Sequence, residues 1–479
     1  MTINVLSDDD LLHIFDYYMA EAQQTEWYTL VYVSQRWRNI VFGSPHRLNL
    51  QIFCTSSMLP RKRLDAWPAL PIVLSANFYQ LYEQDNIKAV LERNERVSQI
   101  SIPILRHGRN DFDVLAALEK PFPVLTDLSL WSTIPSEPIF PDPDKFLGGS
   151  TRLRSLSLSF MPIPEVPKLL PSFTDLVNLR LNRVPAWSRF SPKEIVTGLS
   201  ALTRLEVFHL SLSEPFLWEN QPSSPPTRAV LPSLTVLEFE GGINYLEDFI
   251  ARIDAPLLDR LAVTLRSIDI TGELIFDTDQ IVQFISHVPK FQALGEAHIR
   301  IDNVESTLSI NFLSKQTDTS GPGGSLTVLK VVILCVEPEP ESPCLARFCR
   351  SPFFPLPMLE DLYIEIIYGD GFDGRIFSKE RWLFDGERTR FLQLLRPFTS
   401  VKNLHLSKNF AGRIAPVLKE LGGEIATAVP TFHQENQFFF KVVAFLSLIL
   451  DILIDFNLAL PLCFKFYFSL AGENVWRDL

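Results

Sequence analysis

The stretch LRSLSL (residues 153–158) introduces a pattern that returns along most of the chain. In this pattern an apolar residue is followed by two residues of any type, a second apolar residue, one residue of any type and a third apolar residue. It recurs as LVNLRL (residues 176–181) and LEVFHL (residues 205–210). An alternation with period two places the apolar side chains on one face of an extended strand. The pattern therefore predicts a series of short strands, each with one buried face.

Further copies occupy both sides of these three. They begin at Val97, Leu125, Leu234, Leu258, Leu326, Leu359 and Val401, with a weaker copy at Leu294. The copies up to Leu258 start about 23 to 29 residues apart, in or near the range of leucine-rich repeats, and wider spacing afterwards indicates insertions. Segments such as NYLEDFIARI (residues 244–253) are predicted to link the strands as helices. The array resembles a degenerate leucine-rich-repeat solenoid, whose strands stack in parallel.

A different pattern precedes the repeats. In LSDDDLLHIFDYY (residues 6–18), Ser7 and Asp10 form a variant of the capping box, and Leu11, Ile14, Phe15 and Tyr18 follow on one helical face. The polar segment AEAQQTE (residues 20–26) is expected to end this helix. The apolar pattern restarts at Trp27, includes Ser34, and ends at Gly43 to Pro45. Two or three short helices cannot bury such faces alone, so they must dock on the rest of the chain or on a partner.

The segment from Leu6 to Val41 resembles an F-box, as found in proteins of mushroom-forming fungi. The positions that match are Leu6, Asp9, Leu11, Leu12, Ile14, Phe15, Trp27, Leu30, Val33, Trp37 and Arg38. The chain departs from the family at Ser7, where the family usually has Pro. The alternative is a helical cap that folds onto the solenoid.

These patterns define the expected fold class, which is α/β: a small all-α F-box followed by an irregular leucine-rich-repeat solenoid. The expected divisions are an F-box at residues 1–50, a helical linker at 51–95, the repeats at 96–430 and an atypical hydrophobic tail at 431–479.

The resemblance implies that the protein is not an enzyme and needs no cofactor. It implies the substrate-recognition subunit of an SCF-type ubiquitin ligase, which binds a Skp-family adaptor and cullin complex through the F-box and a target protein through the repeats. The adaptor-binding residues would be Leu6, Leu11, Ile14, Phe15, Leu30, Val33 and Trp37. The resemblance does not say which of them face the adaptor. The alternative is a repeat scaffold whose F-box engages no adaptor.

Polar side chains alternate with the buried positions of the repeats and would form the target surface. They include Asp127, Ser129, Arg154, Ser155, Ser157, Arg180, Arg204, Glu206, Glu238 and Asp361. Repeats stacked in register would align Arg154, Arg180 and Arg204 in one stripe that could bind an acidic or phosphorylated segment. The alternative is that each arginine pairs with a neighbouring acid such as Glu206.

Composition narrows the function classes. A net charge of −12 argues against nucleic acid as a partner. Five cysteines without zinc-site spacing predict no metal site and indicate reduced thiols in a cytoplasmic or nuclear protein. The acidic N-terminus does not resemble a secretory signal.

Two remaining segments bear on other functions. The loop GDGFDG (residues 369–374) matches a dinucleotide-binding spacing, but its two aspartates would repel phosphate, so a loop between repeats is expected. In the tail, the apolar gain of about −6 kcal/mol nearly cancels the cost of Asp451 and Asp455, so membrane anchoring is not expected. A capping helix and an error in the gene model remain as explanations of the tail.

Overall fold

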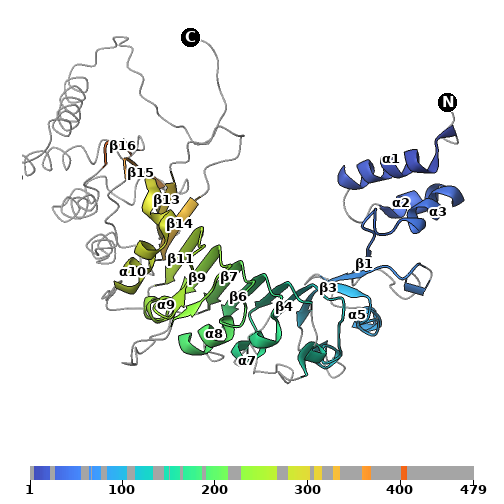
Figure 1. Ribbon diagram of the computed structural model, residues 1–479, viewed down its shortest axis with the longest axis horizontal. Helices are drawn as coiled ribbons and strands as arrows, with labels where there is room; N and C mark the ends of the chain where they lie inside the picture. Colours follow the sequence, from blue (N-terminus) through green and yellow to red (C-terminus); the bar gives the residue numbers. More distant parts are fainter. Residues whose placement is uncertain are drawn as a thin grey trace, which may run out of the picture. The chain divides into compact units, whose positions relative to one another are not determined.

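The structure is a computed structural model, and its described residues form a mixed α/β fold with one large, mostly parallel sheet (Figure 1). The residues described are 5–21, 27–55, 64–65, 67–76, 84–104, 114–132, 145–149, 152–161, 166–185, 190–213, 228–266, 279–302, 307–314, 327–334, 359–367 and 401–406. The chain divides into two compact units: the first comprises residues 1–214 and 227–234, and the second comprises residues 215–226 and 235–479. This division falls inside the range 96–430 that was expected to be one array.

Three helices open the first unit. They are α1 (Asp8–Glu21), α2 (Trp27–Val33) and α3 (Gln35–Gly43). The break between α2 and α3 lies at Ser34, whose backbone is extended and whose hydroxyl accepts a hydrogen bond from the backbone N–H of Trp37 at 3.2 Å. Ser34 therefore caps α3. The prediction that Ser34 belongs to a continuous apolar pattern was wrong. Helix α1 also runs two residues into the polar segment that was expected to end it.

The sheet of the first unit is parallel, and its strands pair in chain order. The strands are β1 (Ile52–Cys54), β2 (Ile72–Ser75), β3 (Val97–Ile104), β4 (Asp127–Ser132), β5 (Ser155–Ser159), β6 (Asn178–Val184) and β7 (Val207–Leu212), and a short strand β8 (Ala229–Val230) follows. The five repeat copies that begin between residues 97 and 205 are thus confirmed as strands. The expected helical linker at residues 51–95 was wrong, because that range contributes β1 and β2 to the sheet.

The register explains why the repeat pattern predicted these strands. Leu128, Leu156, Leu179 and Phe208 occupy one row across β4 to β7, and each is at most 1 % exposed. Full burial of such a side chain contributes about 1.5–3 kcal/mol, so one apolar residue at the same position in each repeat holds neighbouring strands together.

Helical segments link the strands of the first unit. They are α5 (Gln84–Leu91), α6 (Val114–Ala117), α7 (Val166–Leu169) and α8 (Pro192–Leu199), with the 3₁₀ turns η2 (Phe146–Gly149) and η3 (Leu170–Ser172). Figure 1 shows α7 and α8 along one face of the strands. The other face carries the polar positions between the buried ones.

The second unit continues the strand pattern in a different order. Its elements are β9 (Val236–Gly241), α9 (Ile243–Ile250), β10 (Ile253–Asp254), β11 (Arg260–Arg266), α10 (Asp279–His287), η5 (Pro289–Ala293), β12 (Leu294–Asp302), β13 (Thr307–Ser314), β14 (Thr327–Leu334), β15 (Asp361–Ile367) and β16 (Asn403–Leu406). The order in the sheet is β9-β11-β14-β13-β12-β15-β16. The six repeat copies that begin between residues 234 and 401 are all confirmed as strands.

Strand β13 breaks the expected parallel stacking. It runs antiparallel to both neighbours, β12 and β14, and it separates them. The expectation of parallel strands throughout was therefore wrong in the second unit. The Gly369 loop and the tail from residue 431 lie outside the described residues, as do four of the five cysteines. The fifth, Cys54, is a buried thiol that forms no disulfide, as expected.

Candidate functional site

The start of α1 is fixed by reciprocal hydrogen bonds between Ser7 and Asp10. The Ser7 hydroxyl accepts a bond from the Asp10 backbone N–H at 3.2 Å, and the Asp10 carboxylate accepts bonds from the Ser7 backbone N–H at 3.0 Å and hydroxyl at 2.6 Å. Two hydrogen bonds from Ser7 lower the pKa of Asp10, and the bond from the Ser7 side chain has a larger effect than the bond from its backbone. The predicted capping box is confirmed.

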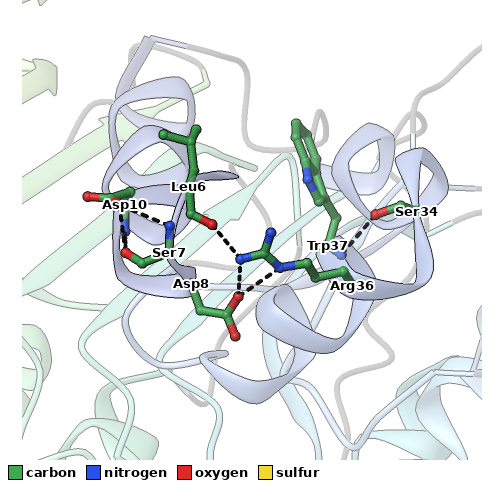
Figure 2. A network of polar contacts seen from close by, with 7 residues as sticks. All are labelled: Leu6, Ser7, Asp8, Asp10, Ser34, Arg36 and Trp37. Carbon is green, nitrogen blue, oxygen red and sulfur yellow. Dashed lines mark hydrogen bonds and ion pairs between the residues drawn. The ribbon is translucent and has the colours of Figure 1, made fainter. Parts of the chain in front are cut away.

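Arg36 of α3 joins the third helix to the start of the first. Its guanidinium donates to the Asp8 carboxylate at 2.7 and 2.9 Å and to the backbone carbonyl of Leu6 at 2.6 Å (Figure 2). The ion pair lies at the surface and alone contributes about 0–1 kcal/mol. The additional bond to the carbonyl fixes the chain that enters α1.

A second arginine joins α1 to the turn that follows α3. Arg47 donates to the Asp16 carboxylate at 2.7 and 2.9 Å, and its guanidinium lies 3.4 Å from the His13 ring. Arg38 of α3 donates to the backbone carbonyl of Val31 in α2 at 3.1 Å. Three arginines of this short helical group thus make polar contacts that hold the helices together.

Aromatic packing connects the helical group to the sheet. The Trp27 ring lies 5.1 Å from the Trp67 ring, and its indole N–H donates to the carbonyl of Gln51 at 3.0 Å. The Tyr28 hydroxyl accepts a hydrogen bond from the backbone N–H of Phe53 in β1 at 2.9 Å. The helices therefore dock on the first strand, and this contact is made by the side of the group that carries Trp27 and Tyr28.

The structure separates the seven predicted adaptor-binding residues into three classes. Leu11, Phe15 and Leu30 are buried among the helices. Leu6 and Trp37 are half-buried, and the Trp37 ring packs 4.8 Å from the Phe15 ring. Ile14 and Val33 are exposed, with 46 % and 59 % of their surface accessible. Of the seven, Ile14 and Val33 are therefore the most accessible to a partner.

Further exposed apolar or aromatic side chains lie on α1 and α2 or just before α1. Tyr17 and Tyr32 are each 67 % exposed, and Val5 is 73 % exposed. Sequence reasoning missed these residues because they lie outside the predicted apolar face and outside the F-box motif. The spacing of Ile14 and Tyr17, three residues apart on α1, is the signal that could have identified them.

The three arginines predicted to bind the target are exposed but are not aligned. The carbonyl of Arg154 accepts from the backbone N–H groups of Val177 and Asn178, which places Arg154 in the row of Val177. Arg180 lies further along β6, in the row of Ser157 and His209.

Arg204 precedes β7 and pairs with Asp175 at 2.9 Å. The expected single stripe of arginines was therefore wrong, because the three lie at different heights along their strands. The alternative of pairing with a neighbouring acid is confirmed for Arg204, although the acid is Asp175.

The other predicted target-surface positions have the expected exposure. None of the ten polar residues named for this surface is buried. In strands β2 to β7, one row consists of Ser75, Ser101, Ser129, Ser157, Arg180 and His209. This row contains no acidic side chain, so Arg180 is its strongest charge.

No protein-family model matches this chain, and no curated protein matches it in sequence. Among the described residues, no three His, Cys, Asp or Glu side chains are placed to hold a metal ion. In the same part of the chain, no helix has the length and apolar character needed to cross a membrane.

Proposed function

We propose that this chain is the target-recognition subunit of an SCF-type ubiquitin ligase, with residues 6–41 acting as an F-box and the strands acting as a degenerate leucine-rich-repeat solenoid. The observation that carries the proposal is the exposure of Ile14 and Val33 on a helical group whose helices are joined by buried side chains and by polar bonds. Exposed apolar side chains on a rigid helical group favour a protein partner. The proposed partner is a Skp-family adaptor.

The departure at Ser7 does not weaken the proposal. Pro at this position would stiffen the entry to α1, and Ser7 achieves an ordered entry by its reciprocal bonds with Asp10. Arg36 adds a bond to the carbonyl of Leu6, next to Ser7. The local order that Pro supplies in the family is thus supplied here by three side chains.

The target would bind the exposed strand face. Arg180 is the centre of this proposed surface, since Ser157 and His209 flank it in the same row and offer further hydrogen-bonding groups. Arg154 and Arg204 would contact a target at other heights along the strands. In this function the protein performs no chemistry and raises the local concentration of the target near the ubiquitin-loaded enzyme.

The test is copurification of the full chain with a Skp-family adaptor. The variant Ile14→Asp with Val33→Asp should abolish capture of the adaptor, because it places two charges on the proposed apolar contact without opening the core. The matched control is Val230→Asp, another exposed valine in the first unit. Phe15→Ala is unsuitable, because Phe15 is fully buried and its loss would disturb the helical group itself.

Two results would distinguish the alternatives. If the unmodified chain captures no adaptor, the chain is a scaffold without ligase function. If the Ile14 and Val33 double variant still captures it, the adaptor contacts other residues and the proposed surface is wrong.

A further inference from the structure

Three rings stack on the exposed strand face of the second unit. His298 of β12, Tyr363 of β15 and His405 of β16 occupy one row of the sheet. The His298 and Tyr363 rings are 4.4 Å apart with planes 19° from parallel, and the Tyr363 and His405 rings are 4.1 Å apart with planes 6° from parallel. The three rings therefore stand side by side, and the two histidine side chains are about two-fifths exposed, at 43 % and 40 %.

Two carboxylates lie beside these rings. Glu296 and Asp361 are directly opposite each other in the register of β12 and β15. Like charges in directly opposite positions of a sheet repel each other and need compensation. Glu296 contacts the ring nitrogen Nε2 of His298 at 2.5 Å, while Asp361 accepts from the Asn403 amide at 2.7 Å and lies 3.9 Å from Nε2 of His405.

The two imidazoles lie next to this acid pair. The other charged groups nearby compensate one another: Lys402 pairs with Glu360 at 2.8 Å, and Arg300 is opposite Glu365 in the register. Lys330 lies in the same row as the rings, but Asn311 of β13 separates it from His298.

We propose that this group of five residues (Glu296, His298, Asp361, Tyr363 and His405), which we name the ring–acid site, binds an arginine side chain of a partner polypeptide. A guanidinium matches both features of the site, since its planar cation stacks against aromatic rings and its N–H groups bond carboxylates in a two-pronged geometry. The described strands place both features on one exposed face, where an extended segment can reach them. The net charge of −12 favours the approach of a basic segment.

The inference rests on the proposed function only in treating the bound segment as part of a ubiquitination target. The binding itself requires no adaptor. A failure to bind arginine would therefore leave adaptor capture untouched, and a failure of adaptor capture would leave the ring–acid site intact.

The test measures fluorescence anisotropy of a labelled dodecapeptide of Gly and Ser that carries three Arg, titrated with the full chain. Matched peptides carry three Lys or three Glu. At pH 7.5 the Arg peptide should bind about tenfold tighter than the Glu peptide and more tightly than the Lys peptide, because only guanidinium combines stacking with paired bonds.

Two variants probe the site without removing a buried side chain. Asp361→Asn keeps the size of the side chain and should weaken binding of the Arg peptide about fivefold or more, since one carboxylate is lost. Glu296→Gln should act in the same direction. The matched control is Glu240→Gln, at an acid of β9 that is paired with Arg266 and that three strands separate from β12. It should leave binding unchanged.

Two results would overturn the proposal. They are equal binding of the Glu and Arg peptides, and Arg-peptide binding that does not change in Asp361→Asn. Either of these would show that the stacked rings serve only to hold β12, β15 and β16 together.

Discussion

The carboxylate of Glu247 in α9 accepts a 2.9 Å hydrogen bond from the backbone N–H of Gln280, at the start of α10. The next N–H, of Ile281, donates to the same carboxylate at 3.2 Å. Glu247 is only 7 % exposed, so a helix of the second unit is capped by a buried acid from the helix before it. The N–H groups at the start of a helix have no partner within the helix, which explains why a carboxylate is stabilising there.

Removing this acid should loosen α10. We expect Glu247→Ala to lower the free energy of unfolding by about 1–2 kcal/mol, the range of a lost helix cap, and to speed hydrogen exchange at residues 281–287. Asp254→Ala, at an exposed acid of the same unit, is the control and should change neither quantity. Unaltered exchange in α10 of the Glu247→Ala protein would contradict the capping role.

The capping box at the start of α8 predicts a dependence of stability on pH. The Glu194 carboxylate accepts hydrogen bonds from the Ser191 backbone N–H at 2.7 Å and from the Ser191 hydroxyl at 2.8 Å. Both bonds lower the pKa of Glu194, and the backbone bond has the larger effect. Because the pKa of Glu194 is lower in the folded state, its charge stabilises the fold above the pKa of this group in the unfolded chain, near 4.5. This stabilisation is lost as the pH falls through the pKa of Glu194 in the folded state.

The measurement compares urea unfolding of the wild type and Glu194→Gln from pH 7 to pH 3. Gln retains the shape of the cap without its charge, so the variant should be less stable at pH 7, and the difference should shrink below about pH 4.5. A difference that stays constant over the whole range would show that charge at residue 194 does not stabilise α8.

Gly198 in α8 should resist replacement by alanine. In a helix interior this change ordinarily stabilises by about 1 kcal/mol. Here a Cβ at residue 198 would lie 2.6 Å from the backbone carbonyl oxygen of Pro167, which cannot move without shifting α7. Gly198→Ala should therefore lower the melting temperature, and the control Gly43→Ala, where no atom lies within 4 Å of the added Cβ, should not. A rise in the melting temperature of Gly198→Ala would mean that α7 shifts without cost.

The contacts of Arg36 predict a local effect on α1. We expect Arg36→Met to lower the stability of the helical group by about 1 kcal/mol and to increase hydrogen exchange in α1, because the bonds to Asp8 and to the carbonyl of Leu6 are lost. Lys193→Met, at an exposed cation on α8, is the matched control. Equal exchange of α1 in the two variants would show that packing alone positions this helix.

The strands were the most predictable part of the fold. Each repeat places apolar residues at the same spacing, and the register brings them into buried rows such as that of Leu156 and Leu179. The spacing within one repeat therefore predicts the strand that packs against its neighbours in the sheet. Strands β1 and β2 were missed because they are short and lack the full pattern. The position of β13 was missed because pairing order depends on distant segments, although Ile310 and Phe312 alternate as in a half-buried strand.

The candidate site was less predictable at the level of single residues. Ile14 and Phe15 are adjacent apolar residues on one turn of α1, and the sequence does not distinguish the buried ring from the exposed side chain. The exposure of Ile14 follows from the positions of α2 and α3, which depend on the break at Ser34 and on Arg36. The ring–acid site was missed for a similar reason, since Tyr363 lies 65 residues after His298, and His405 lies 42 residues after Tyr363.

The antiparallel insertion of β13 has a consequence for how the protein is made. In the first unit each strand from β2 to β7 pairs with the one synthesised just before it, so this sheet can grow strand by strand behind the ribosome. In the second unit β11 pairs with β14, so one edge of β11 stays open until residues 327–334 have emerged. Such delayed pairing slows folding and leaves a strand edge exposed to other chains. Nascent chains that end between β11 and β14 are therefore the ones for which we expect the greatest need of chaperones.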